Sequence, residues 1–430
     1  MNNKYTEVTT RFLRDDERFL LSEEKEMPLV IEAKTHSDPA FLQNFLATNA
    51  TQLLQDMAQY GAVLLRGFDI ASDEQFENTI LSVPQFRAIS EAFMAENGRT
   101  HVGDLKYVLH TNSVYKTGGT LYLGGFHTEN YYSADVPGYI FFYCAEPSPL
   151  GGETGIINTQ KIYQNLDSSL QQKIEEKSFF VSKWLVTEVA EHYKLDPETV
   201  EKIAKHFNLP IEGSGNERFI LMYKPSVFTH PLTKEKALQI NLFEIPTLNH
   251  YLRTYFKADY QGRNWFWHRF FWSLPAPLFN TIEFFAVAAI SFFHSPKNAY
   301  KIMSNKLSGY FARKKTRLSH LDRVGTCFTK EDTKKLAQAM RNQYSSCLWQ
   351  KGDILLIDNR KVMHAGMPGK GSRIIRAMIS NPVAMDYTFK ETGVVYAENR
   401  TSHSVGECMS AAFLPETPLS ESNHSNYDFS

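Results

Sequence analysis

The chain has 430 residues, of which 43% are hydrophobic, and its 46 Lys and Arg nearly balance its 47 Asp and Glu, for a net charge of −1. This length suffices for one large domain with a sizeable insertion, and the balanced charge gives no reason to expect nucleic acid as a partner. The four cysteines show no metal-type pairing, and the N-terminus lacks an apolar signal region. We therefore expect a reduced, cytoplasmic protein.

Hydrophobic periodicity predicts helices and strands that alternate along the chain without an internal repeat. Helices are expected at 41–57, 159–176 and 329–344, the last opened by a capping pair of Thr329 and Asp332. Five apolar runs predict buried strands: 62–66, 139–143, 219–223, 353–357 and 374–379. Cys144 follows the second of these runs and is expected in the core. The pattern favours an α+β or mainly β fold, a double-stranded β-helix (jelly roll) core with flanking helices and a helical insertion.

Residues 251–328 form the predicted insertion, which contains three tryptophans within 264–272 and an almost wholly apolar run at 278–293. The run is too short for a transmembrane helix, which needs roughly 20 apolar residues. Three interpretations stay open: a helical hairpin that enlarges the core, a lid or oligomer interface, and a membrane-surface contact helped by the basic residues 313–317. The core then consists of residues 1–250 and 329–385, followed by a tail at 386–430.

Two short segments carry the residue types of a metal site. His127 and Glu129 are two positions apart, so on a strand both side chains face the same side, and His364 can join them from a distant strand. Two imidazoles and one carboxylate can occupy one face of an octahedral Fe(II) and leave three positions open. Zinc accepts the same ligand types, but the chain has no His-Glu-x-x-His motif to favour a zinc hydrolase.

At this point the sequence resembles the taurine dioxygenase/clavaminate synthase-like family of Fe(II)- and 2-oxoglutarate-dependent oxygenases. The matching blocks occur in the family's order and cover about two-thirds of the chain. They are residues 60–68, 98–103, 126–130, 137–147, the Gly-Gly-Glu-Thr turn at 151–154, and the distal block from Gly352 through His364 to Arg373.

The resemblance implies that His127, Glu129 and His364 bind the iron and that Thr154 binds 2-oxoglutarate. It also implies an arginine clamp on the far carboxylate of 2-oxoglutarate. Arg373 and Arg376 are both candidates, and we favour Arg373. Residues three apart on a regular strand face opposite sides, so only one should point into the site unless a bulge intervenes. A guanidinium can bind a carboxylate through two parallel hydrogen bonds.

The resemblance further implies oxidation of a small or carrier-tethered amino-acid-like substrate, with Fe(II), 2-oxoglutarate and O2 consumed together. Hydroxylation is expected, while desaturation and cyclisation stay open. Many relatives read His-Gly-Arg at the distal ligand, whereas this chain reads His-Ala-Gly at 364–366. Candidate substrate contacts are Arg99, His101, Asn130 and Arg376. The alternative is a catalytically silent binding or membrane-surface scaffold that works through the aromatic and basic insertion, which could also mediate homo-oligomerisation.

Overall fold

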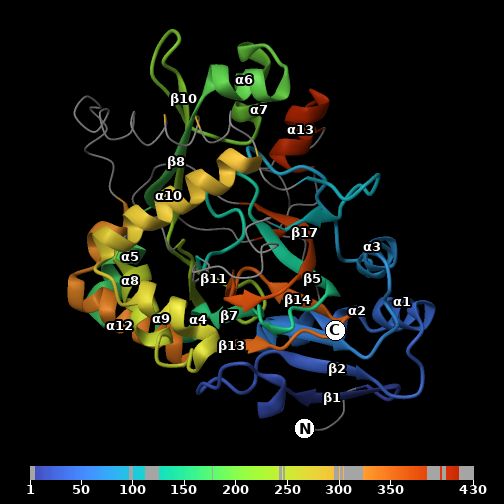
Figure 1. The fold of residues 1–430 in the computed structure, drawn as a ribbon. Helices are drawn as coiled ribbons and strands as arrows, with labels where there is room; N and C mark the ends of the chain where they lie inside the picture. Colours follow the sequence, from blue (N-terminus) through green and yellow to red (C-terminus); the bar gives the residue numbers. More distant parts are fainter. Residues whose placement is uncertain are drawn as a thin grey trace.

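The computed structural model describes residues 5–95, 100–111, 125–176, 178–241, 245, 247–294, 300, 304, 323–384, 398–399 and 403–415. These residues form mixed β-sheets flanked by helices, an α+β arrangement (Figure 1). Arg99 and the basic residues 313–317 lie outside the described residues. Within the described part of the chain, no helix combines the length and apolar character needed to cross a bilayer.

The larger sheet joins strands from both ends of the chain. Its order is β1 (Val8–Phe12), β2 (Leu29–Ala33), β3 (Ala62–Arg66), β14 (Ile354–Asp358), β5 (Pro137–Glu146), β17 (Ile374–Ala384) and β18 (Glu398–Asn399), with β4 (Leu109–His110) also paired to β17. Only β2 and β3 pair in parallel among these described strands. Long-range pairing of this kind places sequence-distant residues side by side.

The smaller sheet carries the residues of the predicted site. It contains β13 (Tyr344–Cys347), β7 (Thr154–Asn158) and β15 (Val362–Gly366), and isolated bridges from His127 to His364 and from His127 to Asn241 extend it. Ile156 of this sheet belongs to the same buried apolar cluster as Leu64 and Phe142 of the larger sheet. The two sheets therefore pack face to face, with successive side chains on each strand alternating between this interior and the outer faces.

Helices cover the two outer faces of this pair of sheets (Figure 1). The larger sheet is covered by α1 (Pro39–Thr48), α2 (Ala50–Tyr60) and α3 (Asp73–Leu81). The apolar cluster outside the smaller sheet includes residues from α4 (Thr159–Gln164), α5 (Ser168–Glu175), α8 (Leu248–Phe256), α9 (Phe266–Trp272), α10 (Ala276–His294) and α12 (Lys330–Asn342). Helices α9 and α10, which lie within residues 251–328, thus contribute side chains to a buried core.

Smaller elements complete the described chain. Three short sheets contain β8 (Ser178–Leu185) with β10 (Phe219–Pro225) and β9 (Ile211–Glu212), β11 (Val227–Thr229) with β12 (Lys236–Leu238), and β6 (Leu150–Gly151) with β16 (Gly369–Lys370). A further apolar cluster joins α6 (Val186–Tyr193), α7 (Pro197–His206) and α13 (Val405–Ala411). Short 3-10 helices lie at Asp15–Glu17, Arg263–Trp265 and Val324–Cys327.

Two predicted helices are each divided in two. The stripe at 41–57 spans α1 and α2, which are separated at Asn49. The side-chain amide of Asn49 donates a hydrogen bond to the Phe45 carbonyl over 2.9 Å. The stripe at 159–176 spans α4 and α5, and Asn165 ends the first of them. In both places the apolar spacing continues across the break, because a polar residue ends one helix without disturbing the buried face.

The remaining predicted elements are confirmed. Helix α12 begins with the expected capping box, in which the Asp332 backbone donates to the Thr329 hydroxyl over 3.1 Å and the Thr329 backbone donates to Asp332 over 2.9 Å. All five predicted strands occur, with ends shifted by a few residues. Cys144 is fully buried, as expected, and burial raises the pKa of its thiol.

Candidate functional site

Backbone pairing brings the two candidate histidines together. The His127 amide donates to the His364 carbonyl over 3.1 Å, and the His364 amide donates to the His127 carbonyl over 3.0 Å. Residues paired in this way present their side chains on the same face, and the two imidazole centroids are 4.5 Å apart. His364 is on β15, whereas His127 forms only an isolated bridge.

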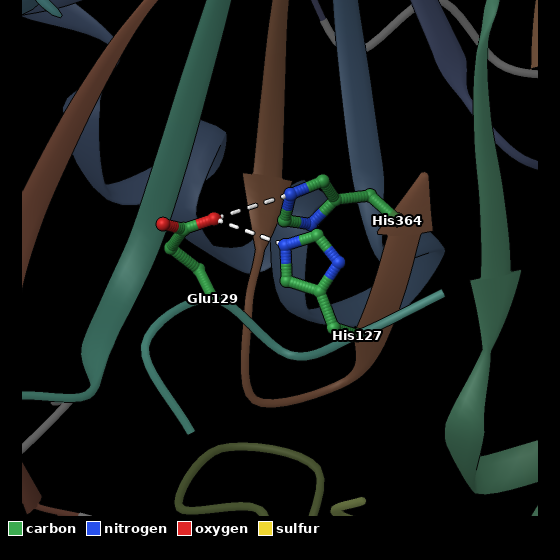
Figure 2. Close-up of side chains that lie close together, drawn as sticks. All are labelled: His127, Glu129 and His364. Atoms are coloured by element: carbon green, nitrogen blue, oxygen red, sulfur yellow. Dashed lines mark ion pairs between the residues drawn. The ribbon is translucent and has the colours of Figure 1, made fainter. Parts of the chain in front are cut away.

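Glu129 reaches the histidines by a different route from the one predicted. Residues 127–129 do not form a strand: the chain turns after Thr128, and Asn130 adopts a positive φ of 52°. The Glu129 Oε2 atom nevertheless lies 3.5 Å from His127 Nε2 and 3.3 Å from His364 Nε2 (Figure 2). A turn therefore replaces strand alternation as the device that aims this carboxylate.

The three side chains offer ligand atoms that all lie within 4.8 Å of one another. Neighbouring ligands about 2.1 Å from one octahedral ion are roughly 3 Å apart, which is close to the observed nitrogen–oxygen separations. Glu129 and His364 are buried, while about a third of the His127 side chain is exposed. The residues present fit one metal ion bound on a single face and approached from the His127 side.

The surroundings favour histidine nitrogens that are available to a metal. His127 Nδ1 lies 2.6 Å from the Gly125 carbonyl oxygen. An Nδ1–H group that donates to this oxygen leaves the Nε2 lone pair directed at the ion. The Phe142 ring packs edge-on against the His364 ring, with centroids 5.1 Å apart, and provides an apolar wall.

Asn359 fixes the backbone of Glu129 through its side-chain amide. Its Oδ1 accepts from the Glu129 amide over 2.8 Å, while its Nδ2 donates to the carbonyl oxygens of Pro137 over 2.8 Å and Glu129 over 3.3 Å. Asn359 is fully buried and directly follows β14. Asn359 falls within the distal matching block of the sequence, but its residue type and position predicted no role for it.

A buried ion pair lies next to Asn359. Asp358 accepts from Arg360 and contacts His230 Nε2 at 2.9 Å. Burial alone would raise the pKa of Asp358, but Arg360 and His230 outweigh it and hold that pKa below its usual range. Burial lowers the pKa of His230. No motif in the sequence marked His230, because an isolated histidine far from its partner carries no signal.

The predicted 2-oxoglutarate residues lie beside the three ligands. Thr154 pairs with Gly366 on β15 and Ile156 pairs with His364, so Thr154 and His364 share the face between the sheets. The Arg373 guanidinium donates to the Gly152 carbonyl and, over 3.4 Å, to that of Glu153. Arg373 is buried. A buried guanidinium next to Thr154 is suited to holding a carboxylate.

Arg376 lies on the outer, helix-covered face of the larger sheet, away from the smaller sheet. Its Nε donates to both oxygens of Asp73 over 3.0 Å, and its Nη1 lies 3.0 Å from His110 Nδ1. Asp73 opens α3, which covers the outer face. The structure thus brings Arg373, and not Arg376, toward the three ligands. Among the other candidates, His101 is exposed and Asn130 is buried in the turn after Glu129.

Glu153 occupies the opposite face of the Gly-Gly-Glu-Thr turn from Thr154. Burial raises the pKa of its carboxyl to about 7, although Tyr344 and Arg373 favour ionisation. The Tyr344 hydroxyl donates to Glu153 Oε1 over 3.0 Å. Trp265 packs against the same turn, since a Cβ added at Gly151 would lie 3.1 Å from its ring. This turn therefore links the helical cover to the site.

The chain is similar to several known proteins. The chain matches the dapdiamide synthesis protein DdaC of Enterobacter agglomerans with 26% identity over 121 residues, which is 28% of this chain and about a third (34%) of that relative's length. Solved structures that resemble it include PvcB of Pseudomonas aeruginosa (13% identity, 94% and 100% of the two chains covered, TM-score 0.46). A taurine dioxygenase from Burkholderia xenovorans gives 11% identity, coverage of 95% and 100%, and a TM-score of 0.44.

The sequence model of one family aligns with residues 24–264, more than half of the chain. This alignment includes His127, Glu129 and the Gly-Gly-Glu-Thr turn, and the fold adds His364 to the same cluster. The chain therefore belongs to the taurine catabolism dioxygenase TauD/TfdA family.

Proposed function

We propose that this protein is a non-haem dioxygenase that uses Fe(II), 2-oxoglutarate and O2. It hydroxylates a small or carrier-tethered, amino-acid-like substrate at an iron held by His127, Glu129 and His364. The observation that supports the ligand assignment most is the cluster of their three ligand atoms within 4.8 Å. The substrate class rests on the family resemblance, and the local match to a dapdiamide synthesis protein agrees with a biosynthetic small molecule.

The chain's own residues have distinct tasks in this proposal. Thr154 and Arg373 bind 2-oxoglutarate, Asn359 holds the Glu129 peptide, and the Phe142 ring keeps water from one side of His364. When bound, iron and 2-oxoglutarate supply the oxidising chemistry, in which O2 converts 2-oxoglutarate to succinate and CO2 and a substrate C–H group to C–OH. Positioning of the substrate carbon is the protein's contribution.

We also propose that the two facing sheets are the halves of a double-stranded β-helix. The bridges of His127 to His364 and Asn241 support this view, because they extend the smaller sheet beyond its three strands. Residues 1–250 and 329–385 would then form one core, since β5 pairs with both β14 and β17. Residues 251–328 would be an insertion into it.

The test is iron-dependent turnover of 2-oxoglutarate without added substrate, measured as succinate formed by protein reconstituted anaerobically with Fe(II). His127→Ala, Glu129→Ala and His364→Ala should each lower turnover by more than about a hundredfold, because loss of an outer-shell partner alone costs roughly 10–100-fold. Circular dichroism should show an unchanged fold. The exposed His192→Ala variant, on α6, is the matched control and should keep its activity. Full iron binding and turnover by His364→Ala would disprove the ligand assignment.

A further inference from the structure

Helices α9 and α10 present an exposed aromatic surface opposite their buried side. Trp265, Trp272 and Phe279 pack into the apolar cluster outside the smaller sheet. Five other large apolar side chains are exposed, and we call them the aromatic face: Phe266, Trp267, Phe270, Leu278 and Phe285. They account for five of the ten exposed large hydrophobic residues in the described part of the chain and lie within 20 positions. Singly scattered exposed residues are normal on a protein surface, whereas exposed residues that gather in one short segment mark a candidate patch.

The aromatic face is continuous over α9. Trp267 contacts Phe266 with ring centroids 5.3 Å apart and Phe270 with centroids 6.0 Å apart. Of the Trp267 side chain, 61% is exposed, whereas His268 and Trp272 on the same helix are buried. One side of α9 is thus anchored in the core, and the other places an indole ring and two phenyl rings in solvent.

Basic residues border the aromatic face. Arg263 is exposed, and Lys257 and Arg269 are partly exposed. The neighbouring acid, Asp259, is already engaged by Arg341 through two hydrogen bonds of 2.8 Å. Residues 257–285 together with Arg341 carry four Lys and Arg against two acids, Asp259 and Glu283. The charge of this region is therefore positive, although the net charge of the whole chain is −1.

We propose that the aromatic face docks on the surface of an anionic lipid bilayer. Trp and Phe beside Lys and Arg are the side chains that enter the interface between acyl chains and headgroups, where indole rings are favoured. Anionic headgroups complement the local positive charge. The buried residues of α9 fix the depth of insertion, because they keep the helix attached to the core while Trp267 and Phe270 enter the interface.

The test uses the full-length protein and vesicles of phosphatidylcholine, with or without phosphatidylserine. Binding measured by flotation should require phosphatidylserine and should weaken at least about tenfold when salt rises from about 0.1 M to about 0.5 M. Trp267 is the only exposed tryptophan of the five. Bound vesicles should therefore shift the fluorescence emission to the blue, and Trp267→Phe should remove most of that shift.

The Trp267→Ala/Phe270→Ala double variant should weaken binding at least about tenfold, because it removes two large aromatic side chains that the interface would bury. The matched control removes two exposed leucines elsewhere, Leu81→Ala/Leu232→Ala, and should bind like the wild type. Both variants should keep wild-type circular dichroism. Absence of binding at low salt, or binding that the double variant retains, would overturn the proposal. Binding to a purified acidic carrier protein but not to vesicles would replace the bilayer with a protein partner.

Discussion

The Asn359 side chain forms hydrogen bonds with both the backbone N–H and the backbone C=O of Glu129. These bonds orient the residue that carries the carboxylate. Without Asn359, the buried Glu129 amide and carbonyl would each lose this hydrogen bond, and a buried group left unsatisfied costs about 1–3 kcal/mol. Glu129 lies in a turn and not on a strand, so no ladder of backbone hydrogen bonds can hold it in place. Asn359 supplies that restraint.

We predict that Asn359→Ala will lower metal affinity about 10–100-fold, as expected for loss of a group that orients a ligand. Asn359→Asp should have an intermediate effect, because its oxygen can still accept from the Glu129 amide but cannot donate to the two carbonyls. Titration with Co(II), followed by its absorption spectrum, measures the affinity. If both variants lose thermal stability but bind Co(II) like the wild type, Asn359 is only structural.

The two arginines should give opposite results. Arg373→Ala should raise the KM for 2-oxoglutarate by about two orders of magnitude, because removing one partner of a buried ion pair costs about 3–5 kcal/mol. Arg376→Ala should leave this KM within a few-fold and lower the melting temperature instead, since Arg376 pairs with Asp73 on the helix-covered face. Asp73→Asn is the matched control and should reproduce the Arg376→Ala result. A large rise in KM for Arg376→Ala would reverse the assignment.

At the level of elements, apolar runs identified the strands because a buried strand must be apolar on both faces, as β3 and β14 are. They could not reveal the breaks at Asn49 and Asn165, where a polar residue ends one helix while the apolar spacing continues into the next. Strand alternation predicted opposite sides for Arg373 and Arg376 on a regular strand. The register of β17 against β5 shifts between Ile374 and Ile375, so the alternation is interrupted between the two arginines. Alternation also could not say which side holds the site, because that depends on which layer each face of the sheet meets.

The same limit applies to the candidate ligands. Residue type and spacing selected His127, Glu129 and His364, but the turn that aims Glu129 has no short-range signature beyond Asn130. His230 was missed because its partner Asp358 is 128 positions away. Residues brought together only by long-range pairing leave no local pattern.

Two tryptophans two positions apart, one just before α9 and one on it, offer a test of the two sides at the start of this helix. Trp265 is buried against Tyr260 and Phe19, whereas Trp267 is exposed. Trp265→Ala should lower the free energy of unfolding by about 3–5 kcal/mol, and Trp267→Ala should change it by less than about 0.5 kcal/mol. Urea denaturation of the two variants measures the difference. Equal losses would show that α9 is buried on both sides.

On the scale of the whole molecule, buried ion pairs tie the N-terminal segment to the larger sheet. Arg66 on β3 donates to both oxygens of Asp353, just before β14, and to Glu17 over 3.0 Å. Burial opposes ionisation of Glu17, but Arg11 and the Arg14 backbone outweigh it and lower its pKa to about 2. A carboxyl with a lowered pKa contributes stability above its unfolded pKa, and that contribution is lost as the pH falls through the folded value. Stability should therefore decline in acid.

Glu153 should have the opposite effect. Its pKa of about 7 means that the folded protein binds this proton more tightly than the unfolded chain does. Its contribution is therefore fully present below about pH 4.5 and declines by about 1.4 kcal/mol per pH unit as the pH rises toward 7. We predict that Glu153→Gln, which cannot ionise, will lose much less stability than the wild type between pH 5 and pH 7, measured by urea denaturation.

The stability of Glu153→Gln should still fall somewhat with rising pH, because burial also raises the pKa values of Glu91 and Asp353. Glu17→Gln is the matched control: it should flatten the acid side of the profile and leave this side unchanged. Equal slopes for Glu153→Gln and the wild type would mean that Glu153 is already ionised at pH 5.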